Sequence, residues 1–392
     1  MPPTASGGTT RRRARFHELE VAEVRPLTAE SIEVTFAVPP ELCGDYDYLP
    51  GQYVALRAHV DGREVRRSYS ICRAPASTSS ATGGTSSATG GTGSATGATS
   101  ISVGIKRDLG GLFSVWAHEN LKPGDRIDVM SPEGTFTSNL PDLDGAHLAG
   151  IAAGSGITPM MALAASALAS SPTARFTLVY TNRATQDVMF LEELADLKDR
   201  HPARLALHHV LSREQRAAPL LSGRIDGEKL DAILDRLVPP ATVTEWFLCG
   251  PFELVALCRD TLERHGVPAG DIRFELFTTD ADTPRADRGR PIETRPGDET
   301  YTVEFTLDGL SSTVDSPVAA NEPILDAALR VRGDVPFACA GGVCGTCRAR
   351  VVEGAVRMTQ NFALEPEELE RGYVLTCQSH PTTERVVVDY DV

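Results

Sequence analysis

Hydrophobic residues between positions 16 and 140 occur in short runs that alternate with polar residues, and no helical period is sustained there. Runs of this length, separated by Pro and Gly turns, are typical of β-strands. The runs are FHELEVAEV, SIEVTFAV, QYVALRAHV, VRRSYSI, ISVGIKR and RIDVMSP. The pattern predicts a small antiparallel β-barrel over residues 16–140.

The pattern changes over residues 141–278, where strand-like apolar runs alternate with helical ones. This alternation is typical of an α/β domain with a parallel sheet. The stretch AHLAGIAAGSGITPMMALAASAL predicts a strand, a glycine turn and a helix, with Thr158 as the N-cap and Pro159 at the first helical position. Further strands are predicted at FTLVYTNR, LALHHVLSREQ and EWFLCGP.

A third pattern covers residues 301–392. YTVEFTLDGLSSTV alternates apolar and polar residues around an Asp308-Gly309 turn, which is a hairpin signal. EPILDAALRVRG then predicts a short helix that begins near Pro323. These elements predict a separate α+β domain at the end of the chain.

Three segments have the composition of connecting chain. The composition of residues 1–15 predicts a disordered tail, and that of residues 279–300 predicts a polar linker rich in Pro and Arg. Residues 76–100 repeat SSATGGT with a period of seven and contain no large apolar residue, so they predict a flexible loop inside the barrel domain. A role for this loop as a partner tether or a flap over the site stays open.

Composition narrows the class of protein. A chain of 392 residues with 41% hydrophobic residues is typical of a soluble protein of two or three domains. No apolar run is long enough to predict a membrane span, and the N-terminus carries no secretory signal. The net charge of -15 argues against a nucleic-acid partner. We therefore expect a cytoplasmic protein with neither membrane nor nucleic-acid partners.

Four of the eight cysteines fall near the end of the chain, at Cys339, Cys344, Cys347 and Cys377. Their spacing is C-x4-C-x2-C followed by 29 residues and the fourth cysteine. This is the plant-type arrangement, in which four thiolates hold a 2Fe-2S cluster. Zinc sites usually have two separate short C-x2-4-C pairs, whereas the two short spacings here share Cys344 and allow only one such pair, as in Cys344 and Cys347. The spacing predicts a one-electron carrier, with zinc as the less favoured alternative.

Other polar and glycine residues stand where ligands usually bind. Gly154, Gly156 and Thr158 lie between a strand and a helix, where free amides face a pyrophosphate in many nucleotide sites. A tight turn without a ligand is the alternative for this motif. On the barrel side, Tyr69 in RSYS can lie against a flat ring and Ser70 can form a hydrogen bond with the ring edge.

These motifs together resemble a known family. The middle of the chain, with GSGITP, YTNR, SREQ and CGP, resembles the nucleotide-binding domain of ferredoxin-NADP reductases, and the barrel with RSYS and GGLFS resembles their flavin domain. The last 90 or so residues, with CAGGVCGTC, resemble a plant-type ferredoxin, which implies a β-grasp fold. This domain carries fourteen Asp and Glu against seven Arg from residue 301 onward, which suits a basic docking partner.

The resemblance assigns roles to individual residues. Arg67 and the amides of Gly111, Leu112, Phe113 and Ser114 are expected to hold flavin phosphates, while Tyr69 and Ser70 contact the isoalloxazine. Cys249, Gly250 and Pro251 are expected to border the nicotinamide. The candidate catalytic residues are therefore Tyr69, Ser70 and Cys249. Glu275 in FELF is a further candidate near the flavin, although a strand end there needs no such role.

The same resemblance places the adenosine 2′-phosphate of the coenzyme at SREQ. Ser212, Arg183 and Arg213 can donate hydrogen bonds to this phosphate, which predicts NADPH over NADH. A surface salt bridge from Arg213 to Glu214 or Asp226 is the alternative. Arg224 is a weaker candidate for the phosphate.

The three domains predict one path for electrons, from NADPH through FAD, which accepts electrons in pairs and releases them singly, to the 2Fe-2S cluster. In order and detail the chain resembles the reductase subunits of bacterial phenylacetyl-CoA epoxidases, which implies a separate di-iron oxygenase as the acceptor. The alternatives for the function are a reductase that serves another aromatic mono- or dioxygenase, a standalone diaphorase and a non-enzymatic iron-sulfur sensor. The alternative for the flavin is FMN.

Overall fold

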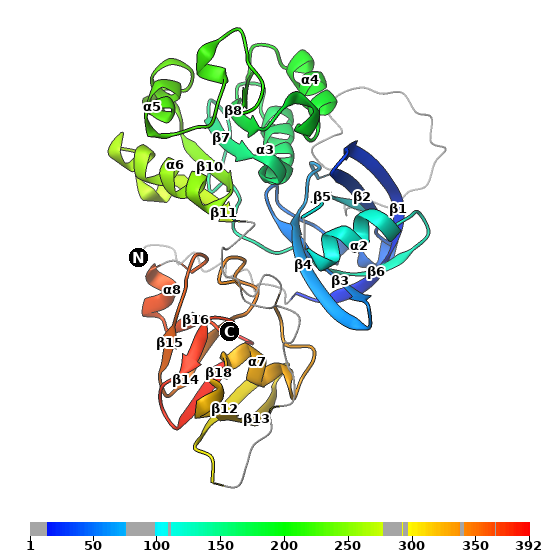
Figure 1. Cartoon of the computed structure of the whole chain (residues 1–392), viewed down its shortest axis with the longest axis vertical. Coiled ribbons are helices and arrows are strands. Elements are labelled where there is room, and N and C mark those ends of the chain that lie inside the picture. Colours follow the sequence, from blue (N-terminus) through cyan, green and yellow to red (C-terminus); the bar gives the residue numbers. More distant parts are fainter. Residues whose placement is uncertain are drawn as a thin grey trace, which may run out of the picture.

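The computed structural model describes residues 14–75, 99–108, 111–276, 292, 297–337, 341–364 and 366–392. These residues form three large sheets, each with its own helices, and β15 (Val356–Met358) pairs with β17 (Ser379–Pro381) in a small fourth sheet near the end of the chain (Figure 1). Most of the predicted tail, of the repeat loop 76–100 and of the linker 279–300 lies outside the described residues, so those domain limits remain predictions. None of the described helices has the length and apolar character that a membrane crossing requires.

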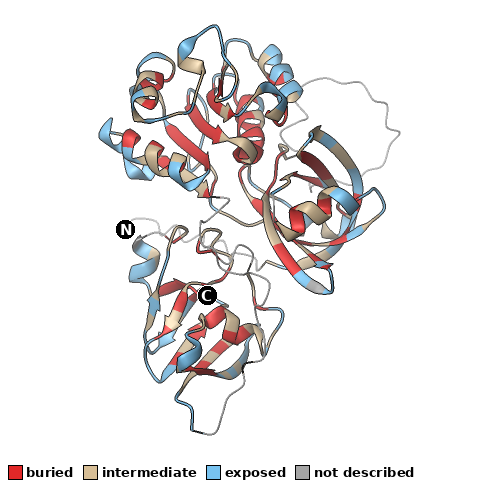
Figure 2. Cartoon of the chain, viewed as in Figure 1, coloured by how far each residue is buried: buried red, intermediate tan, exposed pale blue. Residues whose placement is uncertain are grey.

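The first domain is the predicted antiparallel barrel. Its sheet has the order β4-β3-β6-β1-β2-β5, and an isolated antiparallel bridge between Ile71 and Val103 joins its two outer strands. Alternate residues of each strand face one core, in which Val34, Phe36 and Leu56 are fully buried (Figure 2). The elements are β1 (Phe16–Thr28), β2 (Ser31–Ala37), β3 (Tyr53–Val60), β4 (Arg63–Ser70), β5 (Ser100–Lys106), α2 (Leu112–Asn120) and β6 (Arg126–Met130).

The second domain has a parallel sheet of order β11-β10-β7-β8-β9, as the alternation of strands and helices predicted. One hydrophobic core lies under α3 and α4 on one face, and another lies under α5 and α6 on the other. Burial on both faces explains why β7 and β10 read as nearly continuous apolar runs. The elements are β7 (His147–Ala153), α3 (Ile157–Ser170), β8 (Arg175–Asn182), α4 (Leu191–Arg200), β9 (Leu205–Leu211), α5 (Gly227–Arg236), β10 (Glu245–Gly250), α6 (Phe252–Arg264) and β11 (Ile272–Leu276).

The prediction of Thr158 as the N-cap of α3 was wrong. The turn Gly154–Gly156 is itself a single 3-10 turn that runs directly into the helix, so Gly156 is the N-cap residue. Thr158 already lies in the first turn, and its hydroxyl donates to the carbonyl of Ser155 at 2.9 Å. Gly154 and Gly156 let the chain begin to coil about one turn before the helix start that Thr158 and Pro159 predicted.

The third domain has a mixed sheet of order β13-β12-β18-β14-β16, with α7 packed beside it. The hairpin turn lies where it was predicted, because Asp308 and Gly309 both adopt positive φ, at 58° and 68°. This arrangement agrees with the predicted β-grasp fold. The elements are β12 (Thr300–Leu307), β13 (Leu310–Pro317), α7 (Ile324–Leu329), β14 (Arg348–Glu353), β15 (Val356–Met358), α8 (Pro366–Glu370), β16 (Tyr373–Leu375), β17 (Ser379–Pro381) and β18 (Arg385–Asp389).

A buried carboxylate joins the barrel to the nucleotide-binding domain. Glu33 accepts hydrogen bonds from Arg25 at 2.7 Å and from Arg73 at 2.6 Å, and both arginines also pair with Glu193 of α4. Burial alone would raise the pKa of Glu33, but the bonds and charges of Arg73 and Arg25 outweigh it and hold the pKa below its usual value. The charged network therefore fixes how the two domains face each other.

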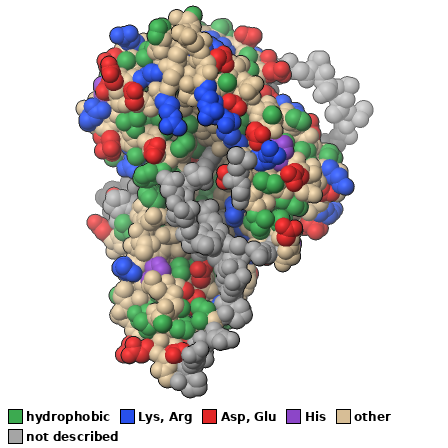
Figure 3. Space-filling model, viewed as in Figure 1, with side chains coloured by type: hydrophobic (Ala, Val, Ile, Leu, Met, Phe, Trp, Pro, Cys, Tyr) green, Lys and Arg blue, Asp and Glu red, His purple; other side chains and the backbone are tan. Residues whose placement is uncertain are grey.

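Acidic and basic side chains are interspersed over the nucleotide-binding domain, at the top of the face shown in Figure 3. No continuous basic patch is visible there. That face of the domain therefore carries both signs of charge.

Candidate active site

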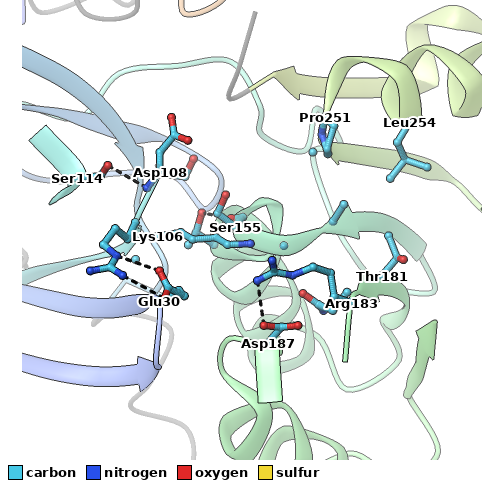
Figure 4. A pocket seen from close by; sticks show the side chains of 18 of the residues that line it. Glu30, Lys106, Asp108, Ser114, Ser155, Thr181, Arg183, Asp187, Pro251 and Leu254 are labelled. Carbon is cyan, nitrogen blue, oxygen red and sulfur yellow. Dashed lines mark hydrogen bonds and ion pairs between the residues drawn. The ribbon is translucent and has the colours of Figure 1, made fainter. Parts of the chain in front are cut away.

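A cavity of about 940 Å³ lies between barrel strand β4 and the carboxyl ends of β7 and β10 (Figure 4). A cavity of this size is within the usual range for a cofactor or a substrate. It collects most of the residues that the sequence predicted for flavin and nucleotide. Those that line it are Arg67, Tyr69, Ser70, Gly111, Ser114, Gly154, Thr158, Arg183, Ser212, Gly250 and Pro251.

Five predicted residues do not line this cavity: Leu112, Phe113, Gly156, Arg213 and Cys249. The Phe113 ring is fully buried in the barrel core, 5.7 Å from the Tyr69 ring. Gly156 packs against the backbone of Cys249 behind the cavity wall. Phe113 and Gly156 thus support the wall, and any direct contact that these five residues make with a cofactor remains a prediction.

Strand β4 and the start of α2 form the barrel side of the cavity. Ser68 lines it with a buried hydroxyl that has no hydrogen-bond partner among the described residues. At the other edge, the hydroxyl of Ser114 accepts from the amide of Asp108 at 3.1 Å, which closes the turn into the helix around Gly111. A β-carbon on Gly111 would lie 2.6 Å from this hydroxyl, so glycine leaves the turn open. The side combines an unsatisfied hydroxyl with a helix N-terminus, which fits a phosphate-bearing ring system.

The nucleotide side of the cavity lies where the strand order of the parallel sheet reverses. Strands β8 and β9 lie on one side of β7, and β10 and β11 on the other, so β7 and β10 flank the switch point. Gly154 has a φ of 54°, which favours glycine. A β-carbon on Gly156 would lie 2.1 Å from the carbonyl oxygen of Cys249. Glycine is therefore required for the two strand ends to approach each other.

Two cations face the middle of the cavity. Lys106 ends β5, and its ammonium would lie 3.1 Å from a β-carbon on Gly154. Burial lowers the pKa of Lys106, and the charge of the nearby Arg183 lowers it further. Arg183 is held by an ion pair with Asp187 at 3.1 Å (Figure 4). Two neighbouring cations beside a glycine turn favour a dianionic ligand such as a pyrophosphate.

Ser70 lines the cavity and is linked to two candidate residues that lie outside it, Glu275 and Cys249. The hydroxyl of Ser70 donates to the carboxylate of Glu275 at 2.9 Å, which links the barrel to β11. Glu275 is the register partner of Cys249 on β10. Burial and the nearby carboxylate raise the pKa of the Cys249 thiol well above its usual value, so this thiol is neutral. The structure thus brings the tentative candidate Glu275 into the site.

The opposite end is lined by Ser212 and Arg224. Arg213 is exposed outside the cavity, and the ion pairs among the described residues do not include it. Of the four residues predicted for the 2′-phosphate, Arg183, Ser212 and the weaker candidate Arg224 therefore line the cavity, and Arg213 does not.

The cysteine loop lies in the third domain, close to the barrel. Cys347 and Cys377 are buried in one hydrophobic core, and the backbone of Thr376 donates to the carbonyl of Cys347 at 3.1 Å. Gly342 and Gly345 adopt φ of 78° and 70°, which turns the loop back on itself. Cys344 lies on the barrel side of this loop, whereas Cys339 is outside the described residues.

Among the described residues, no three His, Cys, Asp or Glu side chains converge on a single metal ion. A 2Fe-2S cluster places four thiolates on two irons, so three protein ligands never share one iron. Cys347 and Cys377 are 30 positions apart in the chain, but they share one core, and Thr376 beside Cys377 bonds to the carbonyl of Cys347. This shared placement fits two thiolates of such a cluster.

Comparisons with known proteins agree with this division of the chain. Residues 151–260 match the oxidoreductase NAD-binding domain family, and residues 305–382 match the 2Fe-2S iron-sulfur cluster binding domain family. The chain is 41% identical to one of the subunits of the 1,2-phenylacetyl-CoA epoxidase of Escherichia coli, over 96% of this chain and 98% of the relative. It is 32% identical to the ferredoxin reductase component of 3-ketosteroid-9-alpha-monooxygenase of Rhodococcus rhodochrous, over 95% and 96%.

The chain belongs to the family of oxygenase reductase components. It has the fold of phthalate dioxygenase reductase, with a TM-score of 0.54 and 20% identity over 95% of this chain and 98% of that one. The predicted electron-transfer oxidoreductase, its ferredoxin-like domain and its nucleotide domain are thereby confirmed. FAD, a pyridine nucleotide and a 2Fe-2S cluster agree with the matched domains and with the shared fold.

For an oxygenase reductase, the residues around the cavity have separable tasks. A bound flavin would supply the change from two-electron to one-electron transfer. Lys106 and Arg183 are placed where they would attract the phosphates of a coenzyme, and the glycines at the switch point would let the protein backbone approach them. The bond between Ser70 and Glu275 holds strands β4 and β11 together beside the cavity. The neutral Cys249 fills the wall behind without adding a charge.

Three residues of this site were missed by sequence reasoning: Ser68, Lys106 and Asn182. Asn182 ends β8 and lines the cavity, and its amide nitrogen has no hydrogen-bond partner among the described residues. Asn182 is the last residue of parallel strand β8, which is a usable signal because ligands of open parallel sheets lie at the strand ends. Lys106 ends β5 of the antiparallel barrel, where this rule gives no signal. Ser68 had no signal beyond its place in RSYS.

Proposed function

We propose that this chain is the NADPH-dependent reductase component of phenylacetyl-CoA epoxidation. It takes electrons from NADPH through FAD in the barrel and a 2Fe-2S cluster on the four cysteines. Its acceptor is a separate di-iron oxygenase of phenylacetate catabolism. It works in the cytoplasm, and this placement is supported by the absence of disulfides among the seven described cysteines.

The observation that carries this proposal is the cavity shared by two domains. Ser70 of the barrel and Glu275 of the nucleotide-binding domain meet at 2.9 Å at its inner end, so a ring bound on β4 and a ring bound at the switch point face each other there. Hydride transfer requires this proximity of two rings. The acceptor is supported by the 41% identity to an epoxidase component over nearly the whole chain.

Reconstitution tests the acceptor. Purified reductase, NADPH, O2 and a phenylacetyl-CoA-binding di-iron oxygenase should together convert phenylacetyl-CoA to its epoxide, with one oxygen atom of O2 entering the product and the other leaving as water. Omission of the reductase should remove the product. The product is measured by mass spectrometry. A reductase that reduces artificial acceptors but supports only a steroid or another aromatic oxygenase would favour the second candidate, which the 32% identical ketosteroid relative suggests.

Replacing Arg224 with Ala should lower kcat/KM for NADPH by roughly tenfold to 100-fold, because a charged hydrogen bond to the 2′-phosphate is worth about 1.5–3 kcal/mol. The kcat/KM for NADH should change less than about twofold, since that coenzyme has a hydroxyl at this place. Arg213→Ala is the matched comparison. Steady-state kinetics with both coenzymes decides, and a larger effect of Arg213→Ala would assign the phosphate to Arg213 instead.

A further inference from the structure

The cluster-bearing domain contacts the barrel through Tyr53, the first residue of β3. Tyr53 is almost fully buried, and its hydroxyl lies 2.8 Å from the carbonyl of Cys344 and 2.6 Å from the hydroxyl of Thr346. The hydroxyl of Thr346 lies in turn 3.1 Å from the sulfur of Cys344. One phenol thus bonds the cysteine loop at two points, and a chain of polar atoms leads from it to a predicted cluster ligand.

Tyr53 is also next to the flavin side of the cavity. It is the antiparallel register partner of Ser70, and paired residues of this kind project from the same face of a sheet with β-carbons about 4.5–5.5 Å apart. Ser70 lines the cavity, whereas Tyr53 lies outside it. Tyr53, Ala55 and Met130 form a small apolar cluster against which Cys344 packs. The side chain of Tyr53 therefore lies in the layer between the cavity and the cysteine loop.

Arg66, on the same hairpin, provides a second link. It is 3% exposed, and its guanidinium donates to the carbonyl of Gly333 at 2.7 Å and to that of Val335 at 3.4 Å. It also lies over the ring of Phe337, 4.6 Å from its centroid. A buried guanidinium needs its donors satisfied, and here backbone carbonyls of the third domain satisfy two of them.

The third domain also contacts the nucleotide-binding domain, through the rings of Phe252 at the start of α6 and Phe362, which lie 5.8 Å apart. The domain is thus held at separate points on two other domains (Figure 1). Tyr53 is the contact that bonds to the cysteine loop itself, and Arg66 bonds to the segment that leads toward that loop.

We propose that Tyr53 and Arg66 are positioning residues that hold the cysteine loop at a fixed distance from the flavin side of the cavity and thereby set the rate of electron transfer to the cluster. The inference rests on the proposed function. Each NADPH is oxidised to NADP⁺ with loss of a hydride, whose proton is released to solvent and whose two electrons leave the cluster singly. Two molecules of a one-electron acceptor such as ferric cytochrome c are then reduced.

The test compares two acceptors of the full-length, cofactor-loaded protein. Under the proposed function, ferricyanide is expected to take electrons from the flavin, and cytochrome c from the cluster. Tyr53→Phe and Arg66→Lys should lower the rate of cytochrome c reduction by about tenfold, since a displacement of the order of 1 Å is enough for such a loss. Ferricyanide reduction should change less than about twofold, because neither residue lines the cavity.

Two barrel residues serve as matched controls. Tyr46 is fully buried like Tyr53, but its hydroxyl donates to the carbonyl of Val129 inside the barrel at 2.7 Å. Arg57 is the register partner of Arg66, but it pairs with Asp128 inside the barrel at 3.0 Å. Tyr46→Phe and Arg57→Lys remove a phenol hydroxyl and a guanidinium without loosening the contact between the barrel and the third domain. The ratio of cytochrome c reduction to ferricyanide reduction should therefore stay at its wild-type value.

Hydrogen exchange provides a readout that does not depend on turnover. In Tyr53→Phe, peptides covering residues 341–347 should exchange faster, while those of β5 should not change. The inference would be overturned if the ratio of cytochrome c reduction to ferricyanide reduction were the same in Tyr53→Phe and wild type. It would also be overturned if Tyr46→Phe lost as much cytochrome c reduction as Tyr53→Phe, or if Tyr53→Phe lost ferricyanide reduction to the same extent. Failure of wild-type protein to oxidise NADPH with ferricyanide would instead overturn the proposed function.

Discussion

Replacing Cys347 or Cys377 with Ser is expected to lower cytochrome c reduction by about 100-fold or more, because residues that act as one unit lose nearly all function when one is removed. Both side chains are buried in the core that holds the cysteine loop, so a serine cannot swing out and leave the rest of the site intact. Reduction of ferricyanide by NADPH should remain within about twofold of wild type, since the flavin side of the cavity is untouched.

Iron, acid-labile sulfide and the visible absorption of the purified variants measure this loss directly. Cys43→Ser is the control: the Cys43 thiol already contacts the carbonyl of Pro39 at 3.6 Å, where a serine hydroxyl can donate instead. Its cluster content should equal that of wild type. Wild-type protein that contains zinc in place of iron and sulfide, or variants that keep a full cluster, would contradict the assignment of these thiols.

Replacing Gly156 with Ala is expected to give the second largest effect, a fall of roughly 100-fold in kcat/KM for NADPH. The new β-carbon would lie 2.1 Å from the carbonyl oxygen and 2.6 Å from the carbonyl carbon of Cys249. Backbone atoms cannot rotate away as a side chain does, so β10 and the start of α3 must separate. The overpacking should also lower the free energy of unfolding by about 1–3 kcal/mol.

The effect of this substitution is steric. Gly156 has a φ of -60° and a ψ of -7°, which alanine adopts without strain. Gly270→Ala in the same domain is the control, because nothing lies within 4 Å of its new β-carbon. Stopped-flow reduction by NADPH and thermal unfolding measure the two expected losses. If Gly156→Ala behaves like Gly270→Ala, the close approach of the strand ends does not limit coenzyme binding.

Local patterns were sufficient for much of this protein. Hydrophobic periodicity predicted the barrel strands, the parallel sheet and the Asp308-Gly309 hairpin, and these predictions match the observed elements. These predictions succeed because a strand buried on one face has alternating apolar and polar residues, whereas a strand buried on both faces is a continuous apolar run. The helix start at Thr158 failed because two glycines allowed a 3-10 turn that a cap-based argument does not consider.

The sequence predicted which site residues lie close together only for those at the ends of the parallel strands. Parallel strands end at one edge of a sheet, so Gly154 and Gly250 were expected together, and they lie together. The choice of Arg224 over Arg213, and the entry of Lys106 from the barrel, depend on how loops and a second domain pack around that edge. No periodicity or motif encodes that packing.

By itself, the sequence determined the order of the three domains, their strands and helices, and the thiol spacing, because each depends on residues close together in the chain. The tertiary structure alone decided that Ser70 bonds to Glu275 and that Tyr53 bonds to the cysteine loop. These partners are separated by 205 and 291 positions. They meet because whole domains pack together, and that packing depends on the summed burial of many residues.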